Sequence, residues 1–375
     1  MNDLTIIVLG AGASKSDGAP MQDELVRVFY ENINQGGIHD GFRDLLLEYF
    51  KKFWDIDRSN YTTRVLPSFE ECIGILDLAY LRKDVIKNAQ SSLIFDHHDV
   101  FDENLIDEIR VALKFLISYS ITKRLYPFQA MPPNNHSTLI GNILKLQDEE
   151  IRKIVFISLN YDLLIDDALR GHFFRKFYVD FDYMWDINKG DWDTYTNINQ
   201  KTEIPLFKLH GSLNWLYCPV CHSKYLTLNS SAYFIYMTPQ DTQFQCRDCG
   251  NRLEPIIIPP TFYKDLSQDL LQKMYIELDT ILRRTKNIFF CGYSFPDADL
   301  HVKYLFKRAE MYHNRENSND KLNIQIFNQA PNDHKPEILS RQEKERYCRF
   351  FTHSNVSYRP QGFEYFCQNF LDLIE

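Results

Sequence analysis

The sequence predicts an α/β protein whose core is a mostly parallel sheet, and three observations lead to this fold class. Short apolar runs rich in β-branched residues alternate with longer stretches of helical apolar spacing, the pattern of strands joined by covering helices. The first run, Leu4–Leu9, stops at a glycine turn, as a buried parallel strand does. Two Cys-x-x-Cys pairs, at residues 218–221 and 246–249, indicate an additional small metal-binding module.

Length and composition limit the possible classes of protein. The chain has 375 residues, which at about 150 residues per domain allows two or three domain-sized units, or one core with large insertions. Hydrophobic residues (44%) and charged residues (25%) stand at the levels of a soluble globular protein. The net charge of −9 argues against a broad electrostatic contact with nucleic acid, so no direct nucleic-acid partner is expected.

The expected compartment is the cytoplasm, without membrane attachment. The first residues carry neither a basic segment nor a small-residue cleavage site, and no stretch approaches about 18 consecutive apolar residues. Eight cysteines in a chain of this length are too sparse for the disulfide framework of a secreted protein. Four of them stand singly and receive no role: Cys72, Cys291, Cys348 and Cys367.

After the first strand the pattern is helical up to about residue 150 and then alternates. The further expected strands are Ile154–Leu159, Ile204–Leu209, Pro255–Ile258, Asn287–Cys291 and Leu322–Phe327. The expected helices are Leu25–Ile33, Phe42–Phe53, Phe69–Ala79, Leu105–Leu125, Leu266–Arg284, Leu300–Tyr312 and Phe363–Ile374. We therefore expect one Rossmann-like domain over residues 1–375, with a helical insertion at 21–150 and a four-cysteine zinc-ribbon module at 215–255.

The glycine turn after the first strand spans Gly10–Ser14. Glycines between a strand and a helix let the backbone approach a pyrophosphate and direct amide N–H groups toward it. The fingerprint of Rossmann dehydrogenases would have Gly or Ala at position 15, where Lys15 stands, and an acidic residue about 20 residues later. Taken alone, the motif indicates a nucleotide site and a structural turn about equally.

Polar side chains gather where two later strands end. Asn160 and Asp162 follow one strand, and His210 follows the next. Ligands of open α/β sheets bind beyond the carboxyl ends of strands, and a histidine there can take a proton near neutral pH. The structural alternatives are that Asn160 or Asp162 caps the following helix, and that His210 is a packed histidine.

Two more strand ends carry candidates for nucleotide binding. Gly292 and Ser294 follow Asn287–Cys291, and Asn328 follows Leu322–Phe327. Residues of these types can hydrogen-bond a phosphate or a ribose, but they are also ordinary turn residues.

The two Cys-x-x-Cys pairs are separated by 24 residues and can surround one tetrahedral zinc ion with four thiolates. The candidate ligands are Cys218, Cys221, Cys246 and Cys249. Four protein ligands leave no open position, so we expect a structural ion and not a catalytic one. Redox-active pairs are the alternative, but nothing else in the chain is thioredoxin-like.

In this order, the features resemble the sirtuin (silent information regulator) superfamily from about residue 4 to about residue 370. The resemblance implies that the phosphates of NAD lie against the two glycine turns, with Asn160 and Asp162 beside the nicotinamide ribose. It also implies that His210 is the catalytic histidine, that Asn328 contacts the adenosine ribose, and that the four cysteines hold structural zinc. The implied NAD-binding residues are Gly10, Ala11, Gly12, Ser14, Pro20, Gly292, Ser294 and Asn328.

Departures from the protein-deacylating sirtuins point to another activity. Deacylases carry Asp-Phe-Arg soon after Gly-x-Pro, where this chain has Met21–Leu25, and Phe-Gly-Glu after the zinc module, where it has Ile258–Thr261. The forms Gly-Ala-Gly-Ala-Ser, Asn-Tyr-Asp and Leu-His-Gly-Ser-Leu-Asn-Trp resemble a bacterial branch that hydrolyses NAD to nicotinamide and ADP-ribose in antiphage defence. We therefore expect an NAD glycohydrolase with catalytic Asn160, Asp162 and His210. The alternatives are a protein-lysine deacylase and a non-catalytic module that binds NAD or ADP-ribose.

An unregulated NAD hydrolase would kill its own cell, and no sensor domain is visible in the chain. We therefore expect a homo-oligomer that is gated by a separate activator. By resemblance, the candidate activators are a hexameric ATPase, a nucleotide-sensing protein and a short argonaute.

Overall fold

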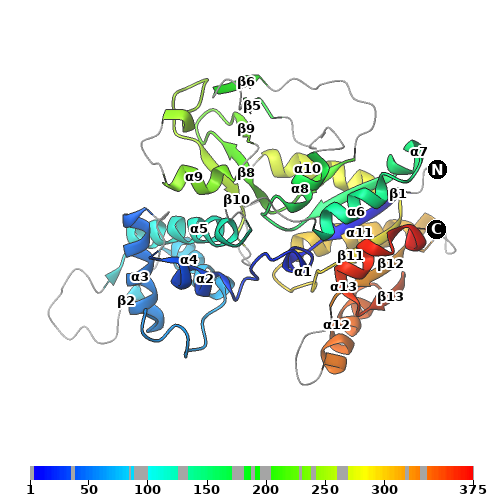
Figure 1. Cartoon of the computed structure of the whole chain (residues 1–375), viewed down its shortest axis with the longest axis horizontal. Coiled ribbons are helices and arrows are strands. Elements are labelled where there is room, and N and C mark those ends of the chain that lie inside the picture. The colour runs from blue at the N-terminus through cyan, green and yellow to red at the C-terminus, as the bar shows by residue number, and fades with distance from the viewer. Residues whose placement is uncertain are drawn as a thin grey trace.

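The computed structural model describes residues 4–34, 39–83, 86–87, 100–125, 134–170, 181–186, 191–194, 204–227, 230–237, 242–259, 269–316, 321–329 and 336–374. The main body of the molecule is a six-stranded sheet in which every neighbouring pair is parallel (Figure 1). In spatial order the strands are β13 (Asn355–Arg359), β12 (Asn323–Phe327), β11 (Thr285–Cys291), β1 (Leu4–Leu9), β4 (Ile154–Ser158) and β7 (Leu206–Lys208). The mostly parallel, Rossmann-like α/β fold that the sequence predicts is confirmed.

The strand order reverses next to β1. From β1 the chain builds outward through β4 and β7, and it then returns to the other side of β1 to form β11, β12 and β13. In open α/β sheets, ligands bind in the crevice at such a reversal, beyond the carboxyl ends of the strands. The residues that follow β1 and β11 are those of the two predicted glycine turns.

The core of this sheet explains why its strands read as continuous apolar runs. All residues of β1 and β4 are buried, as in a parallel sheet covered on both faces. The helices associated with the sheet are α1 (Ala11–Ser16), α6 (Asn135–Ile143), α7 (Asp148–Ile151), α8 (Leu164–Arg170), α10 (Asp269–Leu282), α11 (Leu300–Glu316), α12 (Pro336–Phe350), α13 (Gly362–Gln368) and α14 (Phe370–Ile374). Helix α6 packs against α8 and α13, whereas α10 packs against α11.

Helices between β1 and β4 enclose a second hydrophobic core. These are α2 (Leu25–Asn32), α3 (Asp40–Trp54), α4 (Phe69–Arg82) and α5 (Glu103–Leu125), which lie beside the main sheet in Figure 1. Large aromatic side chains fill this core, among them Phe29, Tyr49, Phe50 and Phe115. Helices α6 and α7 also precede β4, but they contribute to the core of the main sheet. The division into a helical insertion at 21–150 and a module at 215–255 stays a prediction.

A second sheet carries the cysteine pairs. Its five strands, in spatial order, are β10 (Glu254–Ile257), β8 (Gly211–Tyr217), β9 (Lys224–Leu226), β5 (Tyr183–Asp186) and β6 (Asp191–Thr194). Helix α9 (Ser231–Met237) packs on β8, on β10 and on α5, one of the helices that enclose the second hydrophobic core. A short 3-10 turn, Thr242–Phe244, precedes the second cysteine pair, and β2 (Ile86–Lys87) pairs with β3 (Val100–Phe101) separately.

Five of the six expected strands lie in the main sheet, and the sixth is a correction. Pro255–Ile258 forms β10, which pairs antiparallel with β8 in the second sheet. Pro255 has no N–H to donate, and proline is tolerated at a sheet edge, where β10 lies. The expected closing helix Phe363–Ile374 is broken at Asn369 into α13 and α14. Residues 266–268, at the start of another expected helix, lie outside the described residues.

Within the part of the chain that the structure describes, no helix is long and apolar enough to cross a membrane.

Candidate functional site

The two glycine turns pack directly against each other. The Gly12 N–H donates to the carbonyl of Gly292 (2.7 Å), and the Gly10 N–H donates to that of Cys291 (2.9 Å). Gly292 has a φ of +64°, and a Cβ at this position would lie 2.0 Å from the amide nitrogen of Ala13. Glycine is therefore required by the positive φ and by the contact between the two backbones. This contact holds both turns at the reversal beside β1.

A chain of hydrogen bonds joins Asn160, Ser14 and Asp162 across the carboxyl ends of β1 and β4. Asn160 Nδ2 donates to Ser14 Oγ (2.7 Å) and to the Gly10 carbonyl (2.9 Å), and Ser14 Oγ donates to Asp162 Oδ2 (2.7 Å). All three side chains are buried. Buried polar networks that are hydrogen-bonded in this way fix their members relative to one another. The structure therefore brings three of the predicted site residues together.

The amide of Asn160 has one orientation that fits these neighbours. The Gly10 carbonyl can only accept a hydrogen bond, so the atom that contacts it must be Nδ2. Both hydrogens of Nδ2 are then used, and among the described residues none donates a hydrogen bond to Oδ1. Asn160 Oδ1 is therefore an acceptor that a water molecule or a ribose hydroxyl can use.

Asp162 has the capping role that the sequence left open. Helix α8 begins at Leu164, whose N–H donates to Asp162 Oδ1 (3.1 Å). Each carboxylate oxygen has a second lone pair, so the cap does not prevent a contact with a ligand. The capping alternative does not apply to Asn160, whose amide binds the glycine turn.

A buried lysine that the sequence analysis missed is hydrogen-bonded to the backbone of Asp162, a member of this network. Lys208, at the end of β7, is 0% exposed, as is its ion-pair partner Asp166. Its Nζ donates to Asp166 Oδ2 (2.9 Å), to the Asp162 carbonyl (2.6 Å) and to Ser212 Oγ (2.7 Å). Lys208 thus ties the segment that carries Asp162 to the segment that follows His210. A lysine within the apolar run Ile204–Leu209 was the signal that could have identified it.

His210 follows β7 and contacts two residues that the sequence analysis did not select. Its Nδ1 lies 3.1 Å from the Leu159 carbonyl, and its Nε2 lies 3.1 Å from His301 Nε2 and 3.6 Å from Asp299 Oδ1. Asp299 and His301 stand at the start of α11, soon after the Gly292 turn. The signal was the segment Asp297–His301, which places two carboxylates and an imidazole just after a strand-to-helix turn.

Asn328 clamps the backbone of Tyr293. Its Oδ1 accepts from the Tyr293 N–H (3.0 Å), and its Nδ2 donates to the Tyr293 carbonyl (2.8 Å) and to Glu343 Oε1 (2.8 Å). Burial raises the pKa of Glu343, although hydrogen bonds from Tyr358 and Asn328 oppose this. These contacts give Asn328 a turn-stabilising role, and its contact with the adenosine ribose stays a prediction.

The other predicted NAD-binding residues lie on or near the two turns. Ala11 and Ser294 are exposed, and Pro20 is half-buried two residues after Gly18. The Ser294 carbonyl accepts from Arg346 Nη1 (2.7 Å). Contacts of Ala11, Ser294 and Pro20 with NAD stay predictions.

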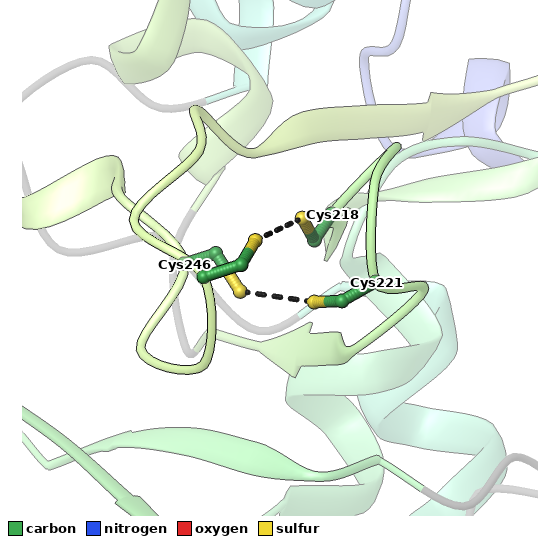
Figure 2. Close-up of side chains that lie close together, drawn as sticks. Cys218, Cys221 and Cys246 are labelled. Atoms are coloured by element: carbon green, nitrogen blue, oxygen red, sulfur yellow. Dashed lines mark hydrogen bonds between the residues drawn. The ribbon is translucent and has the colours of Figure 1, made fainter.

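The four paired cysteines converge in two turns of the same geometry (Figure 2). The His222 N–H donates to the Cys218 carbonyl (3.0 Å), and the Gly250 N–H donates to the Cys246 carbonyl (2.8 Å). Both donors have positive φ angles, +63° and +73°. The two loops therefore present their thiols to a common centre, as Figure 2 shows for Cys218, Cys221 and Cys246.

The distances and the chemistry of this cluster fit one zinc ion. The Sγ atoms of Cys218 and Cys249 lie 3.4 Å apart, those of Cys221 and Cys246 lie 3.3 Å apart, and all four lie within 4.8 Å of one another. Thiolates on a tetrahedral zinc ion lie roughly 3.8 Å apart, given a Zn–S bond of about 2.3 Å. Hydrogen bonds from Ser223 lower the pKa of Cys221, and those from Asn251 lower the pKa of Cys249. Both shifts favour the thiolate form that a metal requires, whereas burial raises the pKa of Cys218 in the absence of a metal.

Replacing Cys246 with serine is expected to lower the zinc content from about one ion per chain to well below half of that. The Tm should fall as well, because metal binding contributes directly to folding. Zinc is measured by elemental analysis and unfolding by circular dichroism. The matched control is Cys348→Ser, since Cys348 is exposed and lies outside the cluster. A folded, fully zinc-loaded Cys246→Ser protein would contradict a four-thiolate site.

One strand connects the cysteine cluster to the predicted catalytic histidine. β8 begins at Gly211, directly after His210, and ends at Tyr217, directly before Cys218. A Cβ at Gly211 would lie 2.0 Å from the Ile256 carbonyl, so glycine allows β10 to approach the start of this strand.

Comparisons with known proteins bear on the family of the chain. No curated protein matches the chain. Among solved structures, SIR2 in complex with the inhibitor EX-527, 2′-O-acetyl-ADP-ribose and a deacetylated p53 peptide is similar at 15% identity and a TM-score of 0.38. The similarity covers 99% of this chain and 93% of that one.

A family model described as a SIR2-like domain matches residues 154–350, slightly more than half of the chain. The match includes Asn160, Asp162, His210 and both cysteine pairs. It supports NAD-dependent activity of the sirtuin type. The chain therefore belongs to the SIR2-like domain family of the sirtuin superfamily.

Proposed function

We propose that the protein is an NAD glycohydrolase, which cleaves NAD to nicotinamide and ADP-ribose. The observation that carries this proposal is the buried Asn160–Ser14–Asp162 chain at the reversal of strand order, with His210 at the neighbouring strand end. NAD would lie across the carboxyl ends of β1 and β11. Its pyrophosphate would face the interlocked turns at Gly10–Ser14 and Gly292.

Cleavage of the nicotinamide–ribose bond leaves positive charge on the ribose and releases a neutral base. The enzyme must therefore hold the ribose open to a water molecule on the face opposite to nicotinamide. Asn160 Oδ1 would accept a hydrogen bond from that water or from a ribose hydroxyl, while its Nδ2 stays fixed on the glycine turn. Asp162 would accept from the carboxamide of nicotinamide, and His210 would act as the general base or orient a ribose hydroxyl. Zinc would hold the cysteine turns together without contacting the substrate.

The segment after β10 favours hydrolysis over protein deacylation. By resemblance, a deacylase uses this stretch to clamp its peptide substrate. Here the Ile258 N–H donates to the His210 carbonyl (3.0 Å) and the Ile258 carbonyl accepts from the Tyr161 hydroxyl (2.5 Å). Pro259 has no N–H to offer, so neither residue supplies a free backbone donor for an added peptide strand. Pro260 and Thr261 lie outside the described residues.

The test is to incubate the purified chain with NAD, with and without an acetylated peptide, and to follow nicotinamide, ADP-ribose and acyl transfer. We expect free ADP-ribose without peptide. Nicotinamide release that occurs only with peptide would instead identify a deacylase. Binding of NAD without products would identify a non-catalytic module.

We further propose that the activity is gated and serves antiphage defence by depleting NAD. The gate would be a homo-oligomer together with a separate activator: a hexameric ATPase, a nucleotide-sensing protein or a short argonaute. The helices α2, α3, α4 and α5, which enclose the second hydrophobic core, are the proposed region of contact with other copies or with the activator. Running the same assay on monomer and oligomer fractions tests the gate, because full turnover by the monomer alone would argue against it.

A further inference from the structure

Two imidazoles and one carboxylate converge beside the predicted site. His210 Nε2 lies 3.1 Å from His301 Nε2 and 3.6 Å from Asp299 Oδ1. One ligand atom from each of the three residues lies within 4.8 Å of the other two. Nitrogen and oxygen ligands of one tetrahedral zinc ion lie roughly 3.3 Å apart, given bonds of about 2.0–2.1 Å. The three side chains therefore stand close to the spacing of ligands around a single metal ion.

The other nitrogen of His210 is arranged as in a metal-binding histidine. Nδ1 lies 3.1 Å from the carbonyl of Leu159, which can only accept a hydrogen bond. Nδ1 therefore carries the hydrogen, and in the neutral imidazole Nε2 presents its lone pair toward His301 and Asp299. Metal-binding histidines donate their other N–H to a backbone carbonyl or a carboxylate in this way, which fixes the tautomer and the orientation of the ring.

The carboxylate of Asp299 is oriented by a similar outer contact. Its Oδ2 accepts from the Tyr293 hydroxyl (2.8 Å), while its Oδ1 faces His210. Carboxylates that bind metals are themselves hydrogen-bonded in this manner. His210 and Asp299 are buried and His301 is half-buried, so the cluster is most accessible on the side of His301.

A buried hydroxyl beside His301 indicates that a further polar group binds here. Tyr275 lies on α10, with its ring centroid 6.0 Å from that of His301. Its hydroxyl oxygen is buried and has no hydrogen-bond partner among the described residues. Leaving a buried hydroxyl unpaired is costly, so a group from outside these residues is its expected partner. A water molecule on the open position of a metal ion with three protein ligands is such a group.

We propose that His210, His301 and Asp299 form a second metal site, which takes a divalent transition-metal ion such as zinc and inhibits NAD cleavage when it is filled. Two imidazoles and one carboxylate suit zinc, whereas magnesium prefers oxygen ligands alone. The site has three protein ligands in place of the four thiolates of the cysteine cluster. We therefore expect its ion to bind more weakly and to exchange with the solution.

The inhibition rests on the proposed glycohydrolase activity and has two physical causes. An ion on Nε2 uses the lone pair with which His210 would accept a proton or a hydrogen bond from a ribose hydroxyl, because Nδ1 already carries a hydrogen. The two imidazoles are neutral and Asp299 carries a single negative charge, so a divalent ion leaves the filled site positive. That charge opposes the positive charge that cleavage develops on the ribose.

The binding test is a calorimetric titration with zinc, started from protein whose cysteine cluster is filled and whose excess zinc has been removed by dialysis against a weak chelator. We expect one further zinc ion to bind per chain and magnesium not to bind. His301→Ala should weaken this second binding about a hundredfold or more, since losing even an outer partner of a ligand costs about 10–100-fold. Tyr293→Phe removes such an outer partner, the hydrogen bond to Asp299, and should weaken it about tenfold or more.

The matched control for the binding test is His313→Ala. His313 lies on the same helix as His301 and contacts the Leu282 carbonyl, so this variant should bind the second ion as wild type does. Circular dichroism checks that each variant is folded. A wild-type protein that takes no second zinc ion, or a folded His301→Ala protein that takes it equally well, would overturn the site.

An activity measurement separates this inference from the proposed function. Filling the second site with zinc should lower nicotinamide release by wild-type protein about tenfold or more, and the same zinc concentration should change the rate of His313→Ala equally. A rate that is unchanged or rises when the site is filled would overturn the inhibition. A second zinc ion in a protein that releases no ADP-ribose, before or after zinc is added, would reject the glycohydrolase and retain the metal site.

Discussion

Replacing Asn160 with alanine is expected to lower kcat for NAD cleavage about a hundredfold, while the protein stays folded. The reason is geometric. Asn160 Nδ2 is held by Ser14 and by the Gly10 carbonyl, and in the proposed function this fixes Oδ1 as the acceptor for the attacking water or a ribose hydroxyl. A misplacement of about 1 Å at a reacting group costs about a hundredfold in rate, and deleting the group costs at least as much. Nicotinamide release under NAD saturation measures the effect.

The matched control is Asn142→Ala. Asn142 Nδ2 donates to the Cys367 carbonyl (2.7 Å), so this variant loses a hydrogen bond of the same kind that does not involve the glycine turns. Both variants should lose about 1 kcal/mol of stability, but only Asn160→Ala should lose turnover. Normal turnover by folded Asn160→Ala protein would refute the role of Asn160.

Replacing Lys208 with methionine is expected to reduce the free energy of unfolding by about 3–5 kcal/mol. The substitution keeps the length of the side chain, but it removes the ammonium beside a carboxylate, Asp166, that is 0% exposed. It also removes the donors to the Asp162 carbonyl and to Ser212. Urea unfolding monitored by circular dichroism measures the loss.

Two comparisons make this prediction specific. Lys52→Met breaks the surface ion pair with Glu48 and should cost no more than about 1 kcal/mol. The double variant Lys208→Met, Asp166→Leu removes both buried charges and should be more stable than Lys208→Met alone. A loss in Lys208→Met no greater than in Lys52→Met would show that the buried pair contributes little.

The sequence was sufficient for the parallel sheet because its strands are buried on both faces and read as apolar runs. β1 and β4 lie within a residue of their predicted bounds for this reason. The edge strand β13 was missed because none of its residues is fully buried, which leaves no apolar run to recognise. β10 was assigned to the wrong sheet because an apolar run does not reveal which strand it pairs with.

The roles of the site residues stay predictions, and the sequence could identify only part of their arrangement, because sequence motifs report residue types and not the direction in which side chains point. Asn160, Ser14 and Asp162 come together as predicted partners of one crevice. The pairing of His210 with His301 joins residues that are far apart in the chain and follows from the packing of α11. Glycine at position 292 is explained by the contact between the two turns. A sequence motif does not distinguish this packing role from a role in binding phosphate.

β8 runs from directly after His210 to directly before Cys218, so the cysteine cluster can constrain the position of His210 through this strand. At about 3.3 Å per residue, the eight steps from His210 to Cys218 span roughly 26 Å. The hydrogen-bond ladders with β9 and β10 permit the strand to slide only in whole residues, and one step would turn every side chain to the other face. By holding one end of β8, the cysteine turns therefore help to fix its register. The position of the His210 imidazole can then change only if the whole strand shifts by a full residue.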